Sequence, residues 1–192
     1  MHETDGKALI EKYRKADHDI DPIFLNRWSP RSFLDKEVPE DKLFSIVEAA
    51  RWAPSSMNKQ PWRFILARTK EDRERFHAFI MDGNLKWCKT APAYMLIISE
   101  KNGPTHAFDT GTAWGYLALQ AAHHGLITHA MGGFHKDKAR EMLQIPEDYD
   151  LHAVVAIGYQ GEKLTLPEDI QEREKPSDRR ALTETVIEGT FK

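Results

Sequence analysis

The sequence predicts a single domain that combines helices and strands around one buried helix. Residues 107–125 contain a helical stretch whose apolar side chains fall on every side of the helical wheel, and such a helix must be covered. Residues 94–99 form a continuous apolar run, which is typical of a strand buried on both faces. With 192 residues and 41% hydrophobic content, the chain can bury a full core and fits one domain better than two.

The predicted helix within residues 107–125 has recognisable start and stop signals. Asp109 or Thr110 can cap its first turn, and Gly125 stands where a left-handed residue would end the helix. Small residues such as Gly111 and Ala118 would let another backbone come close. We therefore interpret this helix as the central rod of the core, which a second subunit could share.

The composition is that of an ordinary soluble protein. A net charge of −3 gives no general reason to expect a nucleic acid or a membrane as partner. The polar, acidic N-terminus is unlike a signal or transit peptide, and no apolar run approaches the roughly 20 residues that cross a bilayer. The single cysteine, Cys88, rules out an internal disulfide and suits a reducing compartment. We expect a cytoplasmic protein in which Cys88 is a packing residue.

The first candidate site follows a charged N-terminal arm, residues 1–20. Arg27, Ser29 and Arg31 alternate along the chain, so in an extended segment all three project to one side. Guanidinium groups and a hydroxyl match the oxygens of a phosphate, which makes this side a candidate anion cradle. A solvated basic turn is the alternative.

A helix and a polar loop are predicted next. Pro39 suits the first turn of a helix over residues 39–53, whose apolar stripe would contain Leu43, Phe44, Val47 and Ala50. The loop that follows, residues 54–62, carries hydroxyls, amides and a lysine between prolines and leads into an apolar strand over residues 62–67. Loops at the head of a core strand commonly carry binding groups. The amides of Asn58 and Gln60 could pair with a ring that has both donors and acceptors.

The second half of the chain alternates helices and strands. The pattern predicts helices over 69–80 and 136–143, a short turn at 85–89, and strands over 94–99, 126–131 and 152–159. Gly132 and Gly133 follow a strand, where the missing Cβ atoms would let a flat ligand approach the backbone. A plain turn is the alternative there. The polar tail after residue 161 contains a second basic pair, Arg179 and Arg180.

Several common kinds of active site are not indicated. The nine histidines include no His-Glu-x-x-His pattern, so we expect no metal site. The chain also lacks a phosphate-binding Walker loop, a Gly-x-Gly-x-x-Gly signature and a Gly-x-Ser-x-Gly elbow. The polar clusters therefore resemble binding groups rather than a nucleophile, acid or base.

Four separated features together resemble the FMN-dependent nitroreductase family, from about Phe24 to Leu182. They are Arg27-x-Ser29-x-Arg31, the run Ala53-Pro54-Ser55-Ser56-x-Asn58-x-Gln60-Pro61-Trp62-x-Phe64, the helix with Asp109-x-Gly111-x-Ala113, and the closing Arg179-Arg180-Ala181-Leu182. The resemblance implies an α+β fold, with a mostly antiparallel sheet flanked by helices, over a single domain of residues 1–192. It also implies an intertwined homodimer with two FMN sites at the subunit interface and a C-terminal extension, residues 161–192, that reaches the partner.

The resemblance also assigns cofactor-binding roles by matching position. Arg27 and Arg179 would hold the FMN phosphate with help from Ser29, and Arg31 would lie at the pyrimidine side of the flavin. The remaining candidates would line the ring, the ribityl chain or the flavin edge: Ser55, Ser56, Asn58, Gln60 as a weaker candidate, Met131, Gly132 and Gly133. Because the cofactor carries the redox step, no residue is assigned as catalytic.

The implied activity is reduction of nitroaromatics, quinones or similar electrophiles with NADH or NADPH, by a ping-pong mechanism. The alternatives are a reductive dehalogenase, a flavin-consuming enzyme, and an FMN-binding protein without turnover. Trp28, Met57 and Trp87 could stack near the flavin or serve as packing residues. The short stretch between Phe64 and Tyr94 leaves little room for extra helices over a substrate pocket.

Overall fold

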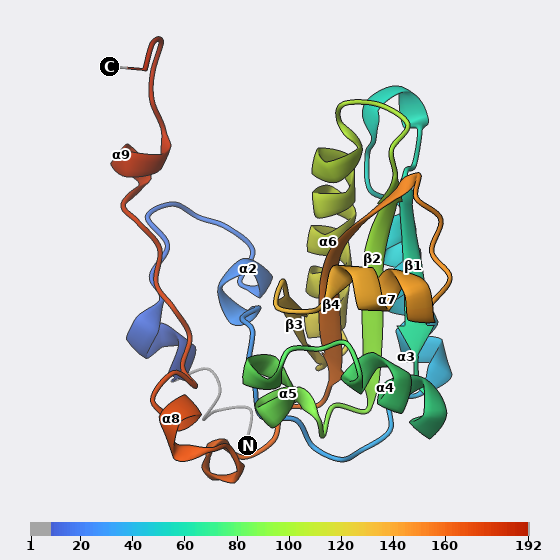
Figure 1. The fold of residues 1–192 in the computed structure, drawn as a ribbon. Helices are drawn as coiled ribbons and strands as arrows, with labels where there is room; N and C mark the ends of the chain where they lie inside the picture. Colours follow the sequence, from blue (N-terminus) through green and yellow to red (C-terminus); the bar gives the residue numbers. More distant parts are fainter. Residues whose placement is uncertain (1–8, 192) are drawn as a thin grey trace.

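The computed structural model describes residues 9–191 and shows one four-stranded antiparallel sheet flanked by helices (Figure 1). The strands are β1 Trp62–Ala67, β2 Ala93–Glu100, β3 Ile127–Met131 and β4 Tyr149–Gly158, in the spatial order β1-β2-β4-β3. The predicted α+β class, antiparallel sheet and four strand positions are confirmed. The observed and predicted ends of the strands agree within one residue except at the start of β4, which lies three residues before the predicted start at residue 152.

Strand β2 occupies the middle of the core. Its residues alternate between two hydrophobic clusters, with Leu96 and Ile98 on one face and Met95 and Ile97 on the other. Helices α3 Glu40–Arg51 and α6 His106–His123 cover the second face (Figure 1). Helices α4 Lys70–His77, α5 Asp82–Cys88 and α7 Lys136–Met142 cover the first. The predicted burial of β2 on both sides is thus confirmed.

Helix α6 begins one turn earlier than its sequence signals indicated. Its N-cap residue is Thr105, so Asp109 and Thr110 lie inside the helix, where both are buried. The predicted capping role of these two residues is wrong. The Asp109 carboxylate instead accepts hydrogen bonds from the Ser56 backbone N–H at 3.1 Å and from the Thr105 hydroxyl at 3.2 Å. The predicted stop at Gly125 is confirmed by its left-handed φ of 69°.

Only one side of α6 is buried within the single chain. Ala113, Leu117 and Ala121 face the sheet and are fully covered. On the outer side, 79% of the Phe108 surface and 42% of the Tyr116 surface remain exposed. The expectation that the whole helix is buried therefore fails for one chain, and the outer apolar face lacks cover among the described residues.

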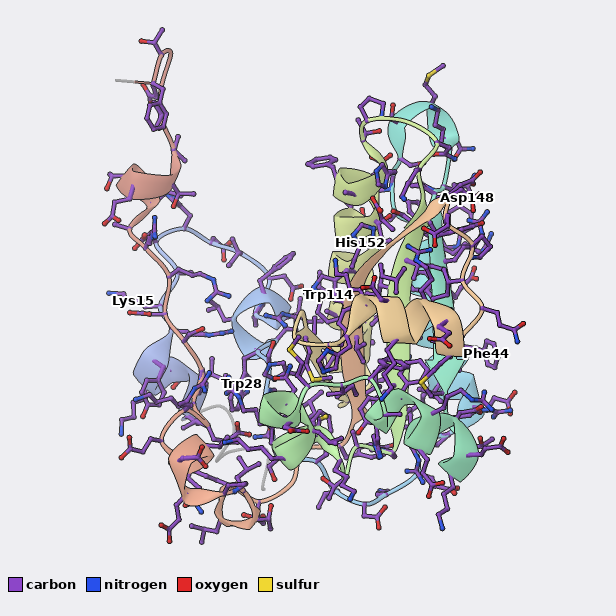
Figure 2. All side chains as sticks on the ribbon, in the orientation of Figure 1. Lys15, Trp28, Phe44, Trp114, Asp148 and His152 are labelled. Atoms are coloured by element: carbon purple, nitrogen blue, oxygen red, sulfur yellow. The ribbon has the colours of Figure 1, made fainter. Side chains whose placement is uncertain are left out.

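Helix α3 buries most of the predicted stripe: Leu43 and Ala50 are in the core and Val47 packs against it, but Phe44 does not. Leu43, Ile46 and Ala50 face the core, whereas Phe44 has 54% of its surface exposed and points outward (Figure 2). The assignment of Phe44 to the inner stripe is wrong. Leu43, Ile46 and Ala50 recur at helical spacing and face the core, and this orientation turns Phe44 to the outside.

The short elements around α5 complete the sheet's first face. The predicted turn at residues 85–89 is a helix, α5, and it buries Cys88 and Trp87. Burial raises the pKa of the Cys88 thiol to about 12, so this group stays protonated near neutral pH. Cys88 is a packing residue, as predicted.

The N- and C-terminal segments lie together beside the sheet domain. Helix α2 Ile23–Asn26 precedes the arginine segment, and the C-terminal extension contains η2 Lys163–Thr165, α8 Glu168–Gln171 and α9 Leu182–Thr185. Figure 1 shows the extension running past α2 and ending away from the sheet. No helix in residues 9–191 is both long and apolar enough to span a bilayer.

A pair of neighbouring substitutions tests the burial pattern of α3. Leu43→Ala should lower the free energy of unfolding by about 2 to 5 kcal/mol, because Leu43 is 1% exposed and the deletion leaves a cavity. Phe44→Ala should change it by less than about 1 kcal/mol, because the ring is largely solvated. Urea denaturation measures both values, and equal losses would contradict the observed orientation of the helix.

Candidate functional site

The predicted arginine segment lines a cavity of about 310 Å³ between α2 and the C-terminal extension. Arg27 ends α2, and its Nη1 lies 3.4 Å from the Ser29 hydroxyl. Arg27, Ser29 and Arg31 all line this cavity, in agreement with their predicted projection to one side. Arg179 of the extension lines it as well, although it lies far from the others in sequence.

A buried carboxylate holds the arginine segment in place. Glu174 is 6% exposed, and its carboxylate accepts hydrogen bonds from the backbone N–H groups of Arg31 at 2.9 Å and Ser32 at 3.1 Å. The Arg31 Nη1 atom lies 3.9 Å from the same carboxylate and donates to the Arg173 carbonyl at 3.2 Å. The C-terminal extension is therefore fixed to the segment that carries the predicted anion-binding groups.

The first cavity is strongly cationic. Among the described residues, its lining contains six cationic side chains and no carboxylate: Arg14, Arg27, Arg31, Arg173, Lys175 and Arg179. Burial, and then repulsion by Arg179, lowers the pKa of Arg27. Such a cluster is unfavourable by itself and favours binding of an anion.

Three of these cations were missed in the sequence. Arg14 belongs to the charged N-terminal arm, and Arg173 and Lys175 belong to the polar extension. None of the three lies in a recognisable sequence motif. They come together only because the two chain ends pack against α2. In the sequence alone, charged residues in such polar segments are indistinguishable from an ordinary solvated surface.

A second cavity of about 400 Å³ adjoins the first and shares Arg31, His129 and Arg173 with it. The predicted Met131, Gly132 and Gly133 line this second cavity. A Cβ at Gly132 would meet no atom within 4 Å, so the backbone there is open. A Cβ at Gly133 would lie 2.6 Å from the Asn84 amide, which donates to the Gly133 carbonyl at 3.1 Å. Gly132 thus leaves an open stretch of backbone, as a flat ligand would require, whereas Asn84 covers the Cβ side of Gly133.

His129 stands where the two cavities meet and was not predicted as a site residue. Its Nδ1 lies 2.9 Å from the Pro30 carbonyl, so this nitrogen carries the proton and donates it. Burial lowers the pKa of His129 to about 4, with Arg31 and Arg27 lowering it further and the contacts to backbone carbonyls opposing them. The ring is therefore neutral near pH 7.

The side chains considered for stacking lie in three different environments. Trp87 is buried and lines the second cavity. The centroid of its ring lies 4.5 Å from the centroid of the His129 ring. Trp28, two residues after the end of α2, lines the first cavity and lies between the extension and α5 in the view of Figure 2. Met57 is 88% exposed and lines neither cavity.

The predicted loop residues do not join the arginine cluster within the single chain. Ser55, Ser56, Asn58 and Gln60 line neither cavity, and Figure 1 shows their loop at the far end of the sheet, near the start of α6. Their polar groups bond locally. The Ser55 hydroxyl accepts from the Gln60 N–H at 3.0 Å, and the Gln60 amide donates to the Asn58 side-chain oxygen at 3.0 Å.

The same loop contains an unusual backbone. Met57, Asn58 and Gln60 have φ values of 53°, 55° and 49°, in the left-handed region that favours glycine. Non-glycine residues remain in such conformations where the surroundings enforce them, and they are common at functional sites. The hydrogen bond from the Ser56 backbone N–H to Asp109 provides one such constraint.

Comparisons with known proteins identify the family of this chain. The nitroreductase family model matches residues 25–86 and 77–159, and the chain belongs to this family. A solved crystal structure of an oxidoreductase containing FMN is 42% identical, covers 93% of this chain and 96% of its own, and superimposes with a TM-score of 0.91.

Curated relatives have two kinds of name. A protein of Archaeoglobus fulgidus, named "Putative NADH dehydrogenase/NAD(P)H nitroreductase", is 25% identical over 146 residues, which cover 71% of this chain and 83% of the relative. The iodotyrosine deiodinase of Thermotoga neapolitana is 27% identical over 158 residues, which cover 69% of this chain and 84% of the relative.

The neutral state of His129 predicts a pH-dependent stability. An unfolded histidine has a pKa of about 6.5, so on acidification toward pH 4 the unfolded state binds a proton that the folded state does not. Stability should therefore fall as the pH drops through this window. In His129→Asn, whose amide can still donate to the Pro30 carbonyl, the loss between about pH 7 and about pH 4.5 should be smaller by about 2 to 3 kcal/mol. Urea denaturation at several pH values measures the difference, and parallel profiles would rule out a buried neutral imidazole.

Proposed function

We propose that this protein is an FMN-dependent NAD(P)H oxidoreductase that reduces nitroaromatic, quinone or similar electrophilic substrates. The observation that carries the proposal is the pair of adjoining cavities, one lined by cations without a carboxylate and the other by an open glycine backbone. Family membership and the 42% identity to an oxidoreductase containing FMN support it.

The cationic cavity fits the phosphate end of FMN. Arg27 and Arg179 would hold the phosphate, and the Ser29 hydroxyl, 3.4 Å from the Arg27 guanidinium, would assist. A phosphate dianion would relieve the repulsion among arginines that burial intensifies. The guanidinium and hydroxyl donors of this cavity therefore suit a phosphate, and no acidic side chain in the lining would have to move away for it to bind.

The second cavity fits a flat ring system. Met131, Gly132 and Gly133 would present their backbone to the flavin edge, and Arg31 would lie at the pyrimidine side, where its charge stabilises negative charge. When bound, FMN supplies the redox chemistry, since flavins accept a hydride from NAD(P)H and pass electrons to an oxidised substrate. The protein's own contribution is orientation and a fixed positive field, in keeping with a ping-pong cycle without a catalytic side chain.

A second candidate activity is reductive dehalogenation. The match to a deiodinase over 69% of this chain favours it specifically, and both activities would use the same cavities. Storage of FMN without turnover is the non-enzymatic alternative.

The proposal includes a homodimer. The predicted binding groups Ser55, Ser56 and Asn58 lie away from both cavities of their own chain, and the outer face of α6 is apolar and exposed. A second copy that covers this face would also bring a second loop, so the partner's loop could complete the ring side of each site. The exposed C-terminal extension, with Val186 and Ile187 about half exposed, would then find cover on the partner.

The function is tested by the spectrum and turnover of the purified protein. We expect a flavin absorbance spectrum that bleaches on anaerobic titration with NADH or NADPH and recovers on addition of a nitroarene or quinone. Recovery only with a halogenated tyrosine would favour the dehalogenase. Bound flavin that no nicotinamide reduces would favour a carrier, and a colourless protein that does not take up FMN would overturn the proposal.

The dimer is tested by a charge on the outer face of α6. A Cβ added at Gly115 would meet nothing within 4 Å in one chain, so Gly115→Glu should leave the subunit folded. It should nevertheless shift the mass in light scattering from a dimer toward the 22.1 kDa monomer, because a carboxylate would be buried in the interface. Lys138→Glu, on the exposed side of α7, is the matched control and should remain dimeric. A wild-type monomer that holds flavin would contradict the interface.

A further inference from the structure

Arg14 is the residue through which the N-terminal arm reaches the cationic cavity. Its Nε donates to the Ser177 carbonyl at 2.8 Å, and its Nη1 donates to the carbonyls of Leu25 at 2.7 Å and Arg27 at 2.8 Å. One guanidinium thus joins three segments: the arm, the end of α2 and the C-terminal extension. Its planar fork is therefore held in a fixed orientation.

The bonds to these carbonyls leave part of the guanidinium available. The Nη2 of Arg14 has no hydrogen-bond partner among residues 9–191, and Arg14 lines the cavity together with Arg27 and Arg179. None of these three arginines forms an ion pair with a carboxylate in the described part of the chain. Burial lowers the pKa of Arg14, and repulsion by Arg179 and Arg27 lowers it further.

We propose that Arg14 is a third arginine of the phosphate subsite, contributed by the N-terminal arm and directed at the phosphate of the flavin. This inference rests on the proposed FMN binding. The three carbonyls occupy the Nε and Nη1 donors of the guanidinium, so the two N–H donors of Nη2 are the ones left for an anion. Placing a charged group beside two other cations is costly unless an anion fills the space between them.

The arrangement also has a consequence for the chain ends. Because the same guanidinium donates to the Ser177 carbonyl and lines the cavity, a phosphate bound there would help to hold the arm and the extension against α2. A flavin without the phosphate would lack this effect. The comparison of FMN with riboflavin therefore isolates the contacts to the phosphate, and the Arg14 variants give the share of Arg14 in them.

The experiment measures FMN and riboflavin affinities of the flavin-stripped full-length protein by quenching of flavin fluorescence. Arg14→Ala should weaken FMN binding by roughly 10- to 100-fold and leave riboflavin binding within about twofold, since a charge-assisted contact to the phosphate is lost. Arg14→Gln, which keeps a donor for the carbonyls but loses the charge, should show the same selective loss. It also serves if Arg14→Ala does not fold.

The matched control is Lys15→Ala, which removes a neighbouring charge from an exposed side chain at the outer edge of the terminal segments (Figure 2). It should change FMN affinity by less than about twofold. Unchanged FMN affinity in both Arg14 variants, or equal losses for FMN and riboflavin, would overturn the inference while leaving the proposed function intact. A wild-type protein that binds neither flavin would overturn the proposed function itself.

A second substitution separates a direct contact from an indirect one. In an Arg179→Ala background, Arg14→Ala should still reduce the preference for FMN over riboflavin, because Arg14 has its own contact with the phosphate. If the effect of Arg14→Ala vanishes in that background, Arg14 acts only by positioning Arg179 and the proposed contact is wrong.

Discussion

Repulsion among clustered arginines, most of which no carboxylate among the described residues neutralises, is the constraint on which the site depends. The chain contains 30 acidic residues, yet none of those described lines the cationic cavity. The nearest buried acid, Glu174, is engaged by the backbone N–H groups of Arg31 and Ser32. Its carboxylate therefore fixes the position of the arginine segment and leaves the more distant cations uncompensated. The fold thus maintains a positively charged receptor before any anion binds, and the anion need not displace an internal partner.

The neutral imidazole of His129 preserves this charge arrangement. A protonated ring at the junction of the cavities would add another cation to the cluster, and burial together with Arg31 opposes that state. The Nδ1 proton is used instead to hold the Pro30 carbonyl, within the segment that carries Ser29 and Arg31. The charge of the site is consequently set by guanidinium groups, which do not titrate near neutral pH. A change of pH in the physiological range should therefore act on stability more than on the charge of the cavity.

Local sequence patterns predicted the parts of this structure that depend on local chemistry. The apolar run of β2, the left-handed Gly125 and the alternation of Arg27, Ser29 and Arg31 each follow from neighbouring residues. The outward position of Phe44 could not be predicted, because two apolar stripes on α3 were compatible with the pattern and only the sheet selects between them. Arg14 gave no signal because its role arises where two chain ends meet. Arg179 stands out in the sequence only as part of a basic pair, and its expected phosphate-binding role comes from the resemblance to a family.

The loop after α3 and the outer face of α6 are physically connected, which bears on how the site could be completed. Asp109 lies inside α6 and accepts a hydrogen bond from the Ser56 backbone, so the helix and the loop are fixed to each other. The left-handed residues of the loop are costly to maintain, and this bond is one of the contacts that hold them.

Anything that packs against the outer face of α6 therefore meets a loop whose conformation is already set. An apolar face with Phe108 and Tyr116 exposed favours an apolar partner, and a second copy of the chain would present the same face in return. In the proposed dimer, covering the helix and supplying the loop to a neighbouring site would be a single event, and the loop and the arginines would meet across the two chains.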